Sequence, residues 1–86
     1  MENTLNQEQF NHIKEAAAEG FARAQFNLAL CYHHGDFVEK DFDEALKWYH
    51  KSADQGNMNA AYALAMMYYK GEEIQRDMEK AFHYFE

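Results

Sequence analysis

The chain contains no proline, and its 86 residues include only four glycines, one serine and one threonine. Proline and glycine break helices, while serine and threonine compete with the helical backbone for hydrogen bonds. The sequence is instead rich in alanine, glutamate, lysine, leucine and methionine, which favour helix. This composition predicts an all-α protein, and the length allows one small domain spanning residues 1–86.

Cysteine and long apolar runs are also scarce. The single cysteine, Cys31, excludes a disulfide within the chain, which fits a reducing compartment. No apolar run approaches the ~20 residues that cross a bilayer, and the N-terminal residues lack the basic and apolar regions of a signal peptide. We therefore expect a cytoplasmic protein.

Basic residues are few, since eight Lys and Arg stand against 15 Asp and Glu for a net charge of −7. Nucleic-acid affinity comes largely from Lys and Arg that neutralise phosphates, and anionic membranes attract the same residues. The sequence therefore predicts neither a nucleic-acid nor a membrane partner, and the charge serves solubility.

What the chain does contain is an internal repeat with an offset of 36 residues. Repeats of 20–50 residues are typical of units that cannot bury a core alone and must stack on their neighbours. Such arrays usually present binding surfaces. Similar residues recur in Phe26/Tyr62, Leu30/Met66 and Trp48/Tyr84. The identical pairs are Ala17/Ala53, Gly20/Gly56, Ala24/Ala60, Leu28/Leu64, Ala29/Ala65, Tyr32/Tyr68, Gly35/Gly71, Asp41/Asp77 and Ala45/Ala81.

Capping residues and apolar spacing predict about five helices. They cover residues 7–18, 22–33, 42–54 and 58–69, and the last begins at 78. Asn6 with Gln9, and Asp41 with Glu44, are spaced as capping boxes. Gly20 and the glycine at position 35 end the first two helices.

Short connections between these helices favour antiparallel neighbours, so the expected architecture is an α-solenoid of antiparallel helix pairs. Residues 6–19 form an unpaired N-terminal helix, 20–55 the first repeat and 56–86 a second, truncated repeat. Trp48 is expected to fill the junction between the units. Because no polar capping helix follows, the chain is expected to be a piece of a longer array or to pair end to end with a second copy.

The repeated residues resemble a Sel-1-like repeat, a helix-pair solenoid unit related to tetratricopeptide repeats. The first copy comprises residues 24–32, Gly35, Val38, Asp41, Ala45 and residues 48–56. The second comprises residues 60–68, Gly71, Asp77, Ala81, Tyr84 and Phe85. The loop departs from the family pattern, which usually has a second glycine and a proline where this chain has Phe37 and Glu39, then Glu73 and Gln75.

The resemblance implies a non-enzymatic adaptor or scaffold that assembles protein complexes. In related helix-pair arrays, the first helix of each unit lines a concave groove that binds a protein or peptide. Aromatic residues with Arg, His and Lys at the edge are the composition of such sites. The alternative for Phe26 and Tyr62 is partial burial between neighbouring first helices. By this analogy the groove residues are Arg23, Phe26, Leu30, His33, His34, Asn59, Tyr62, Met66, Tyr69 and Lys70.

The histidine, cysteine and serine residues of the sequence do not show the spacing of a catalytic or metal site. Adjacent His33 and His34 point about 100° apart on a helix, whereas helical metal pairs prefer a spacing of four residues, so solvent-facing histidines are predicted. Cys31 is expected to be a buried thiol. Ser52 has no lysine three positions further on, so it does not form the Ser-x-x-Lys motif of enzymes that react with β-lactams. We expect no enzyme, no metal and no cofactor. Two alternatives stay open: a self-associating structural fragment, and a small hydrolase or enzyme accessory that uses Cys31, His33 and His34.

Overall fold

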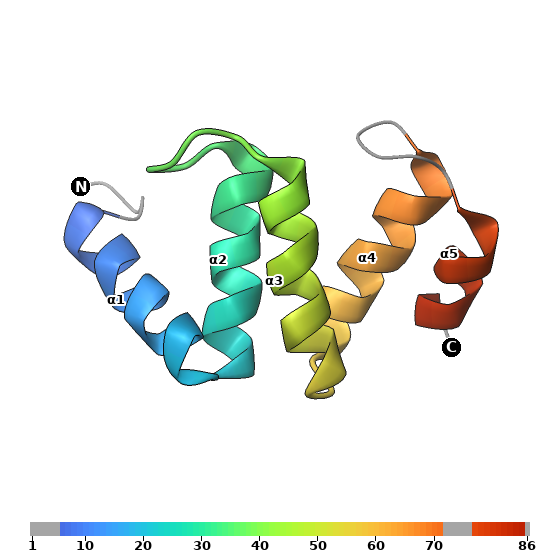
Figure 1. Ribbon diagram of the computed structural model, residues 1–86, viewed down its shortest axis with the longest axis horizontal. Helices are drawn as coiled ribbons and strands as arrows, with labels where there is room; N and C mark the ends of the chain where they lie inside the picture. The colour runs from blue at the N-terminus through green and yellow to red at the C-terminus, as the bar shows by residue number, and fades with distance from the viewer. Residues whose placement is uncertain (1–5, 72–76, 86) are drawn as a thin grey trace.

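The computed structural model of the chain describes residues 6–71 and 77–85, with the side chains of residues 82 and 85 left out. Within these residues the protein is all-helical and forms an α-solenoid, as predicted (Figure 1). Successive helices pack side by side in chain order, from α1 to α5. The helices are α1 (Gln7–Glu19), α2 (Ala22–His34), α3 (Phe42–Asp54), α4 (Met58–Lys70) and α5 (Met78–Phe85).

The predicted caps form, and they recur in the second repeat. Asn6 and Gln9 make the reciprocal capping box of α1. The Asp41 carboxylate accepts the Glu44 N–H at 3.1 Å, and Asp77 accepts the Lys80 N–H at the same distance. Because each cap satisfies N–H groups that the first helical turn leaves unpaired, α3 and α5 begin at equivalent positions.

Helix ends differ slightly from the sequence-based bounds. The helices α1, α2 and α4 each run one residue further, to Glu19, His34 and Lys70, before the residue that turns left-handed. The bounds of α3 agree with the prediction, and its C-cap Gln55 is followed by Gly56 at a φ of 95°.

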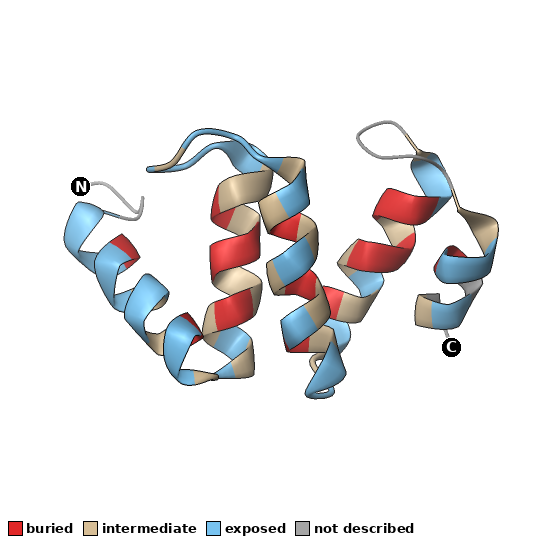
Figure 2. Cartoon of the chain, viewed as in Figure 1, coloured by how far each residue is buried: buried red, intermediate tan, exposed pale blue. Residues whose placement is uncertain are grey.

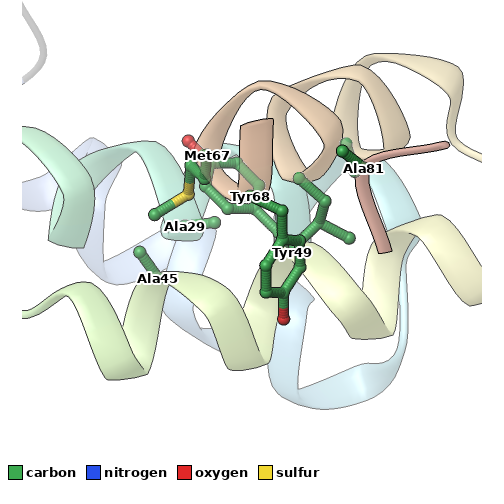
Figure 3. Close-up of a cluster of buried hydrophobic side chains, with 8 residues drawn as sticks. Ala29, Ala45, Tyr49, Met67, Tyr68 and Ala81 are labelled. Atoms are coloured by element: carbon green, nitrogen blue, oxygen red, sulfur yellow. The ribbon is translucent and has the colours of Figure 1, made fainter. Parts of the chain in front are cut away.

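Two apolar clusters hold the helices together, and they lie along the inner faces in Figure 2. The smaller cluster joins α1 to α2 through Phe10, Ala17, Leu28 and Cys31. Trp48, which is half-buried, packs against both clusters, as expected of a junction residue. The larger cluster, shown in Figure 3, is Ala29, Ala45, Tyr49, Ala60, Leu64, Met67, Tyr68 and Ala81.

Side-chain hydrogen bonds join the C-terminal end of α3 to the N-terminal end of α2. Ser52 is fully buried, and its hydroxyl donates to the Ala22 carbonyl at 2.7 Å. The Gln55 amide donates to the Gly20 carbonyl at 2.7 Å and to the Gln25 side-chain oxygen at 2.8 Å. These bonds tie the end of α3 to the start of α2, so Ser52 has a structural role.

In the α2–α3 loop, Phe37 adopts a backbone conformation that is typical of glycine. Phe37 has a φ of 66°, in the left-handed region that residues with a side chain rarely adopt. Its ring stacks on Phe10, with the centroids 5.6 Å apart and the planes inclined by 24°. Contact with α1 therefore offsets the strain at Phe37. The other predicted loop departures at positions 73 and 75 lie outside the described residues.

Candidate functional site

A pocket of about 280 Å³ lies between α2 and α4, the first helices of the two repeats. Lys70 and His34 are exposed at its edge, whereas Leu30 and Met66 are half-buried. Six of the ten predicted groove residues line it: Leu30, His33, His34, Tyr62, Met66 and Lys70. The pocket therefore gathers the central part of the predicted groove into one concave, largely apolar surface.

Sequence reasoning missed three lining residues, Tyr49, Ala63 and Met67. Tyr49 is only 1% exposed and comes from α3, a helix that the analogy left out of the groove. No pattern in the sequence marks it, because its side chain reaches the pocket through the core. Ala63 and Met67 each adjoin a predicted residue on α4, so a wider helical face would have included them.

The other four predicted residues lie outside this lining. Phe26 is half-buried against Tyr49, with ring centroids 5.9 Å apart, so partial burial holds for Phe26. The expectation of partial burial does not hold for Tyr62, which is 61% exposed. Arg23, Asn59 and Tyr69 are exposed, and Tyr69 falls at the position that His33 holds in the first repeat.

A second pocket, of about 320 Å³, lies between α1 and α2. It shares Leu30 and His34 with the first pocket. Its other lining residues are Ile13, Asn27, Cys31 and Asp36. The offset of 36 residues places Asn27, Leu30, Cys31 and His34 at the positions of Ala63, Met66, Met67 and Lys70. The two pockets therefore occupy equivalent places in the two repeats.

Two of the five histidines are half-buried and do not face the solvent fully. His33 is half-buried, and its Nδ1 lies 3.0 Å from the Tyr49 hydroxyl. His50 is half-buried between two tyrosine hydroxyls. His12, His34 and His83 are exposed. Sequence spacing did not predict the burial of these two half-buried histidines, because their hydrogen-bond partners lie on other helices.

The Cys31 thiol, which lines the α1–α2 pocket, is made less reactive by its burial. Cys31 is only 4% exposed, and burial, reinforced by the nearby Asp36 carboxylate, raises the pKa of its thiol. A raised pKa keeps the sulfur protonated and poorly nucleophilic at neutral pH. Among the described residues, no three His, Cys, Asp or Glu side chains are grouped to hold a metal ion. In the same part of the chain, no helix is long and apolar enough to cross a membrane.

Comparison with solved structures shows the same fold in two bacterial proteins. A Sel1 repeat protein from Oxalobacter formigenes superposes with a TM-score of 0.84 at 35% identity, over 91% of this chain and 32% of that one. A protective antigen of uropathogenic Escherichia coli strains, described as displaying an SLR fold, gives a TM-score of 0.85 at 31% identity, over 91% and 17% respectively.

Sequence comparison gives the same relationship. A putative sel1-like repeat-containing protein of Acanthamoeba polyphaga mimivirus is 43% identical over 44 residues, which are 51% of this chain and 8% of that protein. The chain thus spans a small part of the relatives it matches. The model of the Sel1 repeat matches residues 22–57 and 59–86, which together cover most of the chain. By its sequence, its 36-residue period and its fold, the chain belongs to the Sel1 repeat family.

Proposed function

We propose that this chain is a non-enzymatic adaptor or scaffold module that binds a peptide or helix of a partner protein in the pocket between α2 and α4. Sel1 repeats generally mediate protein–protein interaction and are typically non-enzymatic. The observation that carries the proposal is the pocket itself, in which exposed Tyr62 faces a surface built by the first helices of both repeats.

The composition and size of the pocket favour a protein partner. Tyrosine and methionine are enriched in protein interfaces, whose rims are polar and accessible to solvent. A volume of about 280 Å³ is at the lower end of small-molecule sites, which span roughly 300–1,000 Å³. It accommodates one or two side chains of a bound peptide better than a whole cofactor. With a net charge of −7, a protein partner in the cytoplasm is favoured over nucleic acid or membrane.

The contacts of the would-be nucleophiles argue against a hydrolase. The Cys31 thiol is kept protonated by its raised pKa, as described above, and the buried Ser52 hydroxyl donates to a backbone carbonyl. His33 points its Nδ1 at the Tyr49 hydroxyl. Each of these groups is therefore engaged in the packing of the repeat.

Selection from a displayed library of random peptides tests the proposal. Peptides that bind the parent chain are measured by fluorescence anisotropy against Tyr62→Ala and Met66→Ala variants. We expect each variant to weaken binding by roughly tenfold, since truncating a central interface residue costs more than 1 kcal/mol. Circular dichroism checks that both variants keep their helicity.

Met58→Ala provides the matched control. Met58 lies on the same helix and is 83% exposed, yet it is outside the pocket lining. Affinity should be unchanged in this variant. If no peptide is selected, or if Tyr62→Ala and Met66→Ala bind as well as Met58→Ala does, the pocket assignment is wrong.

Self-association is the second candidate, and the exposed face of α4 favours it. Tyr69 is exposed on α4, whereas its counterpart in α2, His33, is half-buried. An exposed aromatic side chain at this position is suited to contact with a second copy of the chain. Light scattering at several concentrations separates a monomer from an assembly.

A further inference from the structure

We propose that one extended peptide fills both pockets at once, with one apolar anchor side chain between α1 and α2 and another between α2 and α4. The inference rests on the proposed function and specifies the class of partner. The peptide carries a basic residue beside the first anchor and an acidic residue beside the second. The two pockets share a wall.

Leu30 and His34 line both pockets and therefore stand between them. Leu30 is half-buried and His34 is exposed, and both belong to α2, so the ridge between the pockets is the face of α2 that carries these two side chains. A slender extended chain can cross such a ridge and place a side chain on each side of it. The bulk of a helix, about 10–12 Å across with its side chains, fits a continuous groove better than two separate pockets.

The 36-residue repeat makes the two pockets structurally equivalent. Asn27 and Cys31 in the first pocket occupy the positions of Ala63 and Met67 in the second. The pockets lie on either side of α2, so their centres are separated by about one helix diameter, roughly 10 Å. A polyproline-II peptide advances about 3.1 Å per residue and returns to the same side every three residues, which is about 9 Å. Two anchors three residues apart therefore match the pockets.

The charged residues of the two pockets differ in sign, and this difference gives the peptide a direction. Asp36 is exposed in the α1–α2 pocket, and Lys70 is exposed in the α2–α4 pocket. At physiological ionic strength the Debye length is about 8 Å, so these local charges act on a bound peptide more strongly than the net charge of the chain does. A basic residue near Asp36 and an acidic residue near Lys70 are complementary to the site.

The experiment uses a displayed library in which two apolar positions, three residues apart, are fixed and the flanking positions are random. Selection is carried out on the parent chain, and the peptides obtained are synthesised with a fluorescent label. Affinities are then measured for the parent, Asp36→Lys, Lys70→Glu and the Met58→Ala control. Both charge reversals change exposed residues, and circular dichroism checks their helicity.

We expect selected peptides to carry a basic flank on one side and an acidic flank on the other. Each charge reversal should weaken binding roughly tenfold, or about 1.4 kcal/mol in total, because it replaces a weak attraction with a comparable repulsion. A peptide with the matching flank reversed should recover the lost affinity. Rescue of each variant by its own flank would show that both pockets are occupied by one peptide.

Two results would overturn the inference, and they are distinguishable. Peptides that depend on Tyr62 and Lys70 but are insensitive to Asp36→Lys use one pocket only; the two-pocket inference then fails while the proposed function stands. If neither this library nor the fully random one yields a peptide whose binding depends on Tyr62, the proposed function fails together with the inference.

Discussion

The imidazole of His50 and the phenol of Tyr84 meet across two helices, with the Tyr84 hydroxyl 2.8 Å from His50 Nδ1. The other ring nitrogen of His50 lies 3.1 Å from the hydroxyl of Tyr68. His50 belongs to α3, Tyr68 to α4 and Tyr84 to α5. One half-buried imidazole thus links the first repeat to both helices of the second.

Acid should weaken this link. Burial lowers the pKa of His50 below its ordinary value of 6.5, Asp54 opposes this shift and Lys80 adds to it. Between the lowered pKa and 6.5, the unfolded chain binds more protons than the folded one, so the free energy of unfolding rises with pH. The contribution is therefore complete above about pH 6.5 and is lost as the pH falls below that value.

Urea denaturation at about pH 7.5 and pH 5.5 measures the effect. The parent should lose more stability on acidification than His50→Gln, which has no proton to gain at this site. The other histidines are present in both proteins, so the difference between the two losses isolates His50. An equal loss of stability in the two proteins would show that His50 does not sense pH.

The helices could be predicted from sequence, whereas the polar contacts between them could not. The 36-residue offset carries the caps at Asp41 and Asp77, and so it locates α3 and α5. The same offset does not predict the role of His50, because the equivalent residue in α1 is Lys14. A bond between side chains 18 or 34 residues apart depends on the stacking of helices, and no local spacing encodes it.

The lining residues of the α2–α4 pocket were likewise only partly predictable from the sequence. Residues Tyr62 and Met66 were predictable because they lie on the face of α4 that repeats the face of Phe26 and Leu30. Tyr49 was not, because a core position on a second helix reaches the pocket only in three dimensions. Periodicity therefore identifies the face of a helix, and the neighbouring helix decides which residues on it stay accessible.

Ser52→Ala should lower stability by about 1 kcal/mol, the typical net worth of one intramolecular hydrogen bond. The hydroxyl is fully buried and donates to the Ala22 carbonyl at 2.7 Å, so no water replaces the lost partner. In a domain of this size the melting temperature should fall by roughly 4–8 °C. Lys51→Ala, at the exposed neighbouring position, should melt close to the parent. Similar melting of both variants would remove the structural role of Ser52.

Phe37→Gly and Phe37→Ala separate backbone strain from ring stacking. Both substitutions remove the contact with Phe10, but only glycine adopts a φ of 66° without strain. The glycine variant should therefore be more stable than the alanine variant by about 1 kcal/mol. At an ordinary loop position the order is reversed, because alanine restricts the unfolded chain. Chemical denaturation of the pair gives the order, and a more stable alanine variant would contradict the left-handed conformation.

Trp48→Ala tests the junction between the two clusters, and Tyr84→Ala is its counterpart in the second repeat. Both side chains are half-buried, but Trp48 packs against both clusters whereas Tyr84 packs against the larger one only. Truncating a buried tryptophan costs about 3–5 kcal/mol, and partial exposure places Trp48→Ala near the lower end. Tyr84→Ala should cost less, because it leaves the α1–α2 cluster intact. Urea denaturation of both variants measures the two losses. If Trp48→Ala is no more destabilising than Tyr84→Ala, the clusters are joined by other contacts, and the tryptophan is a surface residue of one repeat.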